Sequence, residues 1–488
     1  MSSISWGLLQ QAELVSRSRS NNSSKPAHIF SIHLVFKVPL VHGSATSYEH
    51  LNIHTELLYG LKPVPELENS NGTDAVLKTL RGKYKDGSIV AYLCGGPGDG
   101  NPPFTIKELN NYFLEKGRPI LYVDYRGTGL SSPVTAAVMR IKGNAKQRAE
   151  YLTHFRQDSI VADLEAIRKC LGGPTFSLLG QSYGGWVAMT YLSFLPGSLK
   201  EVWLTGGMPP IGKTPDDTYK ALYKGLIDIN KEYYKEYEKD KAAVSRIVQW
   251  LHERHENGVS IRNGARLTWR GFLTLGRRLG AEGGFKAVHG IVQQFDKAAK
   301  SQESKDLSDA VRAFDEINGT GFRLPQRPLY GVMHEAIYCS GPNIASNWAA
   351  QRIGGSYDPH LSWLRNGSTD LCLSNGGPTP YFTSEMIHSF MLEDAGPELE
   401  PFLEPANILA KKYNWPALYE TAALRNNTVP VRALMFPKDL FVEYELSLAA
   451  ANDVRCCKAV PSPKEWLHAS IKTNTEEVCK KFIGGELK

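Results

Sequence analysis

The hexapeptide Gly-Gln-Ser-Tyr-Gly-Gly at 180–185 places a serine between closely spaced glycines. A short apolar run at 175–179 precedes it, and a helical pattern at 186–195 follows it. This order predicts a strand, a tight turn and a helix, which together lift the serine hydroxyl above the end of the strand. Glycines suit the neighbouring positions because side chains there would clash. We therefore predict that Ser182 is a nucleophile; the alternative is a tight turn without catalysis.

A second glycine-rich turn, Cys94-Gly95-Gly96-Pro97-Gly98, follows the apolar run 88–93. A serine that attacks a carbonyl needs backbone N–H groups to stabilise the oxyanion, and glycines let the backbone approach it closely. We assign these donors to the N–H of Gly96, or of Gly95, and to the N–H of Tyr183. A phosphate-binding loop is the rival interpretation, but no Gly-Lys-Ser/Thr follows the glycines.

The acid and base of a serine nucleophile can be sought from chain order. In hydrolases with this kind of turn, an acidic residue and then a histidine follow the serine along the chain. His468 is the one histidine after His388, so it is the candidate base, although it could be a surface histidine. Asp439 comes just after the apolar run 429–436 and is the candidate acid. Glu443 and Glu445 are the alternatives.

The elements that must position these residues show a repeating pattern. Four short apolar runs stop at glycine-rich turns, as strands buried on both faces of a parallel sheet do: 88–93, 119–123, 175–179 and 200–204. The helical pattern at 158–171 lies between two of them, which indicates βαβ units. Further strands are expected at 29–41, 51–58 and 429–436.

The character of the chain changes after about residue 210. Residues 214–257 are rich in Tyr, Lys and Glu, and helical patterns continue to about 420. We predict an α/β-hydrolase fold, a mostly parallel doubly wound sheet, with an inserted, mainly helical cap. The core is expected at 29–210 and 425–488, the cap at 211–424, and a disordered tail at 1–28.

Composition excludes several classes of function. The 56 basic and 50 acidic residues give a formal charge of +6, and no basic run is interleaved with aromatics, so no nucleic acid is expected. No run of about 18 apolar residues exists, so no membrane span is expected. Seven scattered cysteines favour a reducing, cytoplasmic location. His252 and His255 are three residues apart rather than four, so no zinc site is predicted. No metal or cofactor is implied, and the oligomeric state is left open.

Together these motifs resemble the prolyl aminopeptidases (proline iminopeptidases), especially the long fungal-type members. The resemblance runs from about 29 to 472 and rests on these segments: YLCGGPG at 92–98, VDYRGTGLSS at 123–132, FRQDSIVADLEAIRKCL at 155–171, GQSYGGW at 180–186, HEAIYC at 334–339, SNWAAQR at 346–352, YFTSEM at 381–386 and WLHAS at 466–470. It implies an enzyme that releases an N-terminal residue, usually proline, from short peptides.

The resemblance also implies acidic cap residues that hold the substrate's free amino group, and by position these are Glu335 and Glu385; the alternative is that both are ordinary cap residues. In the VDYRG turn we expect an ion pair between Arg126 and Asp124 beneath the site. Family members often have His or Gln at the position of Cys94, so this thiol could change substrate fit or make the site sensitive to thiol reagents. The alternatives are a related hydrolase of a non-peptide amide, ester or lactone, and a non-catalytic binding protein.

Overall fold

In the computed structural model, residues 4–20, 25–43, 49–69, 72–84, 86–254, 257–261, 264–365, 371–373 and 376–487 are described. Nine strands of this part form one sheet in the order β1-β2-β3-β5-β4-β6-β7-β10-β11. They are β1 (Glu13–Arg19), β2 (Phe30–Pro39), β3 (His50–Gly60), β4 (Val90–Leu93), β5 (Ile120–Val123), β6 (Phe176–Gln181), β7 (Leu199–Thr205), β10 (Val431–Met435) and β11 (Cys457–Pro461).

The sheet is antiparallel at one edge and parallel through the rest. The strands from β1 to β5 pair antiparallel in the order β1-β2-β3-β5, and every pairing from β5 to β11 is parallel. The central strands β4, β5 and β6 are buried at every residue, which explains why all their residues except Gln181 are apolar or small. The predicted α/β-hydrolase architecture is therefore confirmed, with the carboxyl ends of β4, β6 and β10 at one edge of the sheet.

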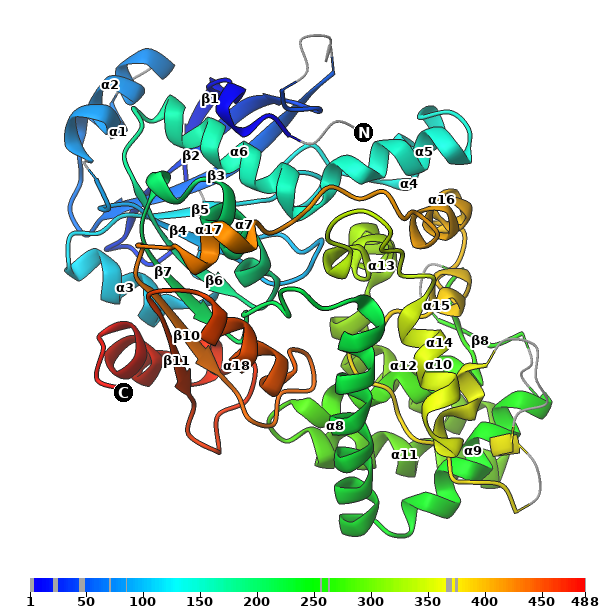
Figure 1. The fold of residues 1–488 in the computed structure, drawn as a ribbon. Helices are drawn as coiled ribbons and strands as arrows, with labels where there is room; N and C mark the ends of the chain where they lie inside the picture. Colours follow the sequence, from blue (N-terminus) through cyan, green and yellow to red (C-terminus); the bar gives the residue numbers. More distant parts are fainter. Residues whose placement is uncertain are drawn as a thin grey trace.

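Helices lie on both sides of this sheet (Figure 1). The helices in the chain segments around the sheet are α1 (Pro65–Glu68), α2 (Thr73–Lys83), α3 (Lys107–Glu115), α4 (Ala136–Ile141), α5 (Ala145–Leu152), α6 (Gln157–Cys170), α7 (Tyr183–Phe194), α17 (Thr421–Arg425), α18 (Tyr444–Asp453), α19 (Ser470–Thr473) and α20 (Thr475–Glu477). The last turn, Val478–Ile483, is a π-helix.

Between β7 and α17 the regular elements of the described chain are helices joined by loops, apart from the short hairpin β8 (Val259–Ser260) and β9 (Arg266–Leu267). Its helices are α8 (Pro215–Glu236), α9 (Asp240–Arg254), α10 (Trp269–Leu273), α11 (Gly284–Ser301), α12 (Ser304–Phe322), α13 (Pro328–Met333), α14 (Ala349–Tyr357), α15 (Ser389–Asp394) and α16 (Glu400–Ala410). Figure 1 shows most of them grouped beside the sheet. The exact limits of a cap at 211 and 424 stay a prediction. In the described part of the chain, no helix has the length and apolar character needed to cross a membrane.

The prediction of a disordered tail at 1–28 is wrong for residues 13–19. These residues form β1, which pairs antiparallel with β2. Only Leu14 of β1 is buried, so the strand lacks the alternating apolar pattern by which strands are predicted. Its stability comes from the backbone ladder to β2 and from Arg19, whose guanidinium donates to the Glu68 carbonyl at 2.9 Å. Residues 1–3 and 21–24 of the predicted tail lie outside the described residues.

One buried arginine joins the helical segment to the core. Arg156 precedes α6 and forms an ion pair with Asp158 at 2.8 Å. Its guanidinium also donates to the carbonyls of Cys339 at 2.6 Å and Pro416 at 2.9 Å, and it stacks over the Trp415 ring. A charged group this deeply buried needs such partners. Arg156 therefore fixes two distant parts of the chain against the first turn of α6.

Candidate active site

Ser182 lies at the turn between β6 and α7, as predicted. Its φ of 53° and ψ of −126° lie outside the regions that L-residues favour. The glycines around it are required by close backbone packing. A Cβ at Gly184 would lie 2.0 Å from the Leu93 carbonyl oxygen, and one at Gly180 would lie 2.6 Å from the Gly184 oxygen. The structure thus holds the serine in a strained backbone conformation of the kind found at functional sites.

Asp439 and His468 come together although they follow different strands. Nδ1 of His468 lies 2.7 Å from Oδ2 of Asp439, and the Asp439 side chain is only 1% exposed. The other carboxylate oxygen, Oδ1, accepts the N–H groups of Phe441 at 2.8 Å and Val442 at 3.1 Å. Burial alone would lower the pKa of His468, but the charge and hydrogen bond of Asp439 outweigh it, so the pKa is raised. The pair can orient and stabilise a protonated imidazole.

The two alternative acids have other roles. Glu443 accepts the N–H of Leu446 at 2.7 Å and so caps the first turn of α18. Glu445 is exposed on the same helix. The geometry therefore favours Asp439 over both.

Ser182 and His468 line one cavity of about 370 Å³, together with Gly96, Glu385 and Arg277. This volume suits a small ligand such as one or two residues of a peptide. The glycine-rich loop after β4 forms one wall. A Cβ at Gly95 would lie 3.2 Å from Cβ of Ser182, so the loop backbone directly contacts the serine. The N–H of Tyr183, at the start of α7, is adjacent in sequence to the nucleophile.

Glu385 is the predicted cap glutamate that reaches this cavity. Its Oε1 accepts a hydrogen bond from the Tyr330 hydroxyl and lies 2.8 Å from Nη2 of Arg277. Burial would raise the pKa of Glu385, but Arg277, His334 and His468 outweigh it and lower the pKa to about 2. Glu385 is therefore a carboxylate at all ordinary pH values. Sequence reasoning missed Arg277 and Tyr330, because neither belongs to a motif and both are distant from Glu385 in the chain.

Glu335 is not among the residues that line this cavity. Its side chain is buried, and Oε1 accepts the N–H of Ala350 at 2.8 Å in the first turn of α14. Oε2 is buried with no hydrogen-bond partner. Burial is the main cause of its raised pKa of about 7. The structure thus brings only one of the two predicted glutamates to the cavity.

One expectation about the side chains near the site is wrong. Arg126 does not pair with Asp124; its guanidinium binds both oxygens of Asp163 in α6, at 2.6 and 2.7 Å. The Cys94 thiol is buried, and burial raises its pKa far above the ordinary value. Because the thiolate is the reactive form, we do not expect thiol reagents to attack Cys94.

Comparisons with known proteins place the chain among the α/β hydrolases. Residues 90–313 match the family described as alpha/beta hydrolase fold. A proline iminopeptidase of Aeromonas sobria is 35% identical over 396 residues, which are 81% of this chain and 86% of that protein. Proline iminopeptidase aneH of Aspergillus aculeatus is 34% identical over 398 residues, 80% of this chain and 83% of that protein. Because this likeness extends over most of each chain, the protein belongs to the proline iminopeptidase family of α/β hydrolases.

Proposed function

We propose that the protein is a serine aminopeptidase that releases N-terminal proline, or another small residue, from short peptides through an acyl-enzyme on Ser182. The observation that carries this proposal is the shared cavity, which Ser182 and His468 line together with an ionised carboxylate, Glu385, while Asp439 binds Nδ1 of His468. A nucleophile beside a fixed negative charge suits a substrate whose amino group is close to its scissile carbonyl. The names of the two relatives give independent support.

In the proposed mechanism Ser182 attacks the carbonyl carbon while Nε2 of His468 takes the hydroxyl proton. Asp439 holds the imidazole through Nδ1 and stabilises its charge. The N–H groups of Gly96, or Gly95, and of Tyr183 stabilise the oxyanion, and one such donor contributes about 3 kcal/mol. His468 then gives its proton to the leaving amine. Water then attacks the acyl group: His468 takes a proton from the water and gives it to the Ser182 oxygen as the bond between that oxygen and the acyl carbon breaks, which releases the amino acid.

The proposal assigns direct contact with the substrate's ammonium group to Glu385. It assigns no direct contact with the ammonium group to Glu335, because the Glu335 carboxyl binds the backbone of α14 and does not line the cavity. Its part in amino-group recognition is therefore indirect, through the position of α14. The seven cysteines are all free thiols, which supports the accompanying proposal of a reducing, cytoplasmic location.

An assay with three substrates tests the proposed function. The substrates are proline naphthylamide, the same compound with an acetylated amino group, and a small neutral ester. An aminopeptidase releases naphthylamine from the first and leaves the second nearly untouched. Equal rates on the free and the acetylated amide would contradict the proposal. Turnover of the ester alone would indicate that the protein uses the same serine mechanism on a different class of substrate.

One observation favours that second candidate, a hydrolase of a non-peptide amide, ester or lactone. Arg277 lies 2.8 Å from Glu385 and partly compensates its charge inside the cavity. A cavity with paired charges also tolerates a neutral acyl group, because no buried charge is left without a partner. The three-substrate assay separates the two functions.

Replacing Glu385 with glutamine is expected to raise KM for proline naphthylamide by about 10- to 100-fold. This range corresponds to the loss of a charge-assisted hydrogen bond of about 1.5–3 kcal/mol. The matched control is Glu282→Gln, since Glu282 lines the same cavity but is exposed. We expect the control to change KM by less than about twofold. A similar KM for both variants would show that Glu385 does not bind the substrate.

We also expect kcat/KM to fall as the pH decreases through the pKa of His468 in the free enzyme. The base must be neutral to take the serine proton, and its pKa is raised, so the fall begins above the ordinary histidine value of about 6.5. His334, in the same region, has a pKa lowered by burial to about 4 and does not titrate in this window. A pH–rate profile with no change between about pH 5 and 8 would exclude a histidine base.

A further inference from the structure

The VDYRG segment at 123–127 begins at the last residue of β5 and has no part in the proposed mechanism. Its aspartate, Asp124, is buried, and three groups donate to its carboxylate. They are the N–H of Asn101 at 2.7 Å, the N–H of Leu130 at 2.9 Å and Nδ1 of His54 at 3.1 Å. Asn101 is the last residue of the glycine-rich loop that contains Gly96. The Asp124 carboxylate therefore fixes the far end of that loop.

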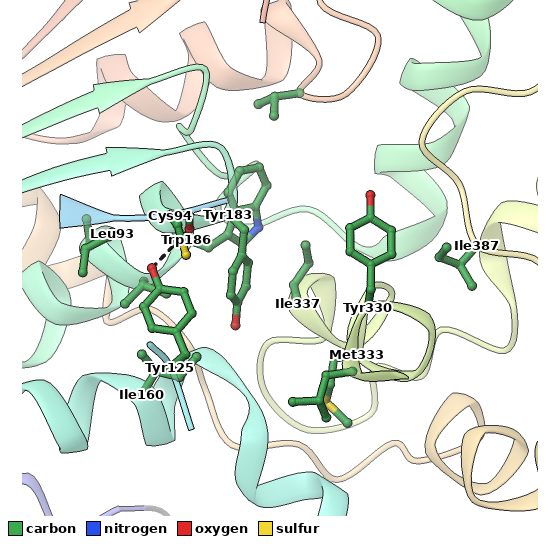
Figure 2. Close-up of a cluster of buried hydrophobic side chains, with 14 of the residues drawn as sticks. Leu93, Cys94, Tyr125, Ile160, Tyr183, Trp186, Tyr330, Met333, Ile337 and Ile387 are labelled. Carbon is green, nitrogen blue, oxygen red and sulfur yellow. Dashed lines mark hydrogen bonds between the residues drawn. The ribbon is translucent and has the colours of Figure 1, made fainter. Parts of the chain in front are cut away.

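The next residue, Tyr125, binds the near end of the same loop. Its hydroxyl donates to the carbonyl of Cys94 at 3.2 Å, the bond drawn as a dashed line in Figure 2. The Tyr125 ring also packs edge-to-face on the ring of Tyr183, with centroids 6.2 Å apart. Tyr125 thus contacts both segments to which the oxyanion donors are assigned. Its side chain is only 1% exposed, so solvent cannot replace the hydroxyl easily.

Neighbouring contacts make this support rigid. The side-chain amide of Asn101 donates to the carbonyl of Tyr92 at 2.9 Å and to that of Val123 at 3.3 Å, at the ends of β4 and β5. Behind Asp124, Nε2 of His54 lies 2.9 Å from Nδ1 of His33. When Nδ1 of His54 donates to Asp124, Nε2 accepts from His33, so the histidine is held from both sides. Gly129 leaves the space for the carboxylate, since a Cβ there would lie 2.3 Å from it.

We propose that Asp124 and Tyr125 are positioning residues of the oxyanion hole: they fix the two ends of loop 94–101 and so set the N–H of Gly96 relative to Ser182. The inference rests on the proposed serine mechanism, in which Gly96 stabilises the oxyanion. A loop whose N–H groups must meet a developing charge needs to be fixed before the reaction, because reorganisation during it costs rate. Neither side chain lines the cavity, so both act through the loop.

Tyr125→Phe and Asp124→Asn test this inference with small changes of shape. Tyr125→Phe removes one hydroxyl and keeps the ring, and we expect kcat to fall about 5- to 10-fold. The three donors to Asp124 now share two carboxylate oxygens, whereas the amide of Asp124→Asn offers them only one oxygen. One backbone N–H group therefore loses its acceptor and is displaced. We expect a fall of about 30-fold or more, because a misplacement of 1 Å can cost about 100-fold. KM is expected to change less than about twofold in both variants.

Each variant has a control of the same chemistry elsewhere in the fold. Tyr84→Phe also removes a buried hydroxyl that donates to a backbone carbonyl, that of Tyr59 at 3.0 Å. Asp240→Asn alters a buried aspartate with contacts to a tyrosine hydroxyl, His289 and Gln293. We expect the controls to lower the melting temperature as much as the test variants do, but to leave kcat within about twofold of wild type.

A second readout does not depend on the substrate. A fluorophosphonate probe modifies the nucleophilic serine, and its phosphonyl oxygen occupies the oxyanion hole. The rate of Ser182 modification should fall in both test variants and not in the controls. Equal rates in test and control variants would overturn the inference. Wild type could fail to cleave proline naphthylamide and still show rapid Ser182 modification that the test variants slow. This outcome would reject only the aminopeptidase assignment. An unlabelled Ser182 in wild type would overturn both.

Discussion

Ser182→Ala is expected to reduce kcat for proline naphthylamide by about five to six orders of magnitude, to the rate that the oxyanion donors and binding supply without a nucleophile. The effect is this large because the serine, His468 and Asp439 act as one unit. The structure holds the Ser182 backbone at a φ of 53°, in a turn that the neighbouring glycines permit, and alanine fits there as well as serine does. The fold should therefore survive. Release of naphthylamine and fluorophosphonate labelling measure the loss.

Ser177→Ala is the control for this variant. Ser177 lies in the same strand, β6, but it binds Glu201 at 3.0 Å and the Gly87 carbonyl at 3.3 Å, near the other end of the strand. Its loss should leave kcat within about twofold of wild type. Unchanged labelling of Ser182→Ala, or a loss of activity in the control as large as in the test variant, would contradict the role of Ser182.

The sequence predicts those parts of the site in which the structural requirement restricts the residue types close by in the chain. The turn around Ser182 needs glycines because the backbone of β4 passes within contact of Gly184, and that need appears locally in the sequence. Asp439 and His468 were predicted from their order after the serine, and the structure brings them to 2.7 Å. The strands were predicted because burial on both faces leaves apolar runs.

The parts that sequence did not predict depend on contacts between distant segments. The residues next to Glu335 and Glu385 in the sequence do not indicate which carboxyl faces the cavity. Arg277 and Tyr330, which are distant in the chain, hold the Glu385 carboxylate there by donating to its Oε1. Similarly, Arg126 pairs with Asp163 in α6, whereas Asp124, two residues before it, binds three donors from other segments. The strand β1 depends on its ladder to β2 rather than on its own apolar residues. Such partners are fixed only when the whole chain has folded.

Asp439→Asn is expected to lower kcat by about four orders of magnitude, and the structure shows why. The N–H groups of Phe441 and Val442 both donate to Oδ1, so the amide oxygen of asparagine must take that position. Its NH₂ group then faces Nδ1 of His468 in place of Oδ2. Nδ1 becomes an acceptor, the ring proton moves to Nε2, and Nε2 can no longer take the proton of Ser182.

The same change makes a second, independent prediction about pH. The charge and hydrogen bond of Asp439 are what raise the pKa of His468 against the effect of burial. Without them burial dominates and the pKa falls, so the acid limb of the remaining activity should move to lower pH. Glu443→Gln, the matched variant of the alternative acid, removes only a charge at the cap of α18 and should keep both kcat and the acid limb. If Glu443→Gln instead lost activity and shifted the limb while Asp439→Asn did neither, Glu443 would be the acid that orients His468.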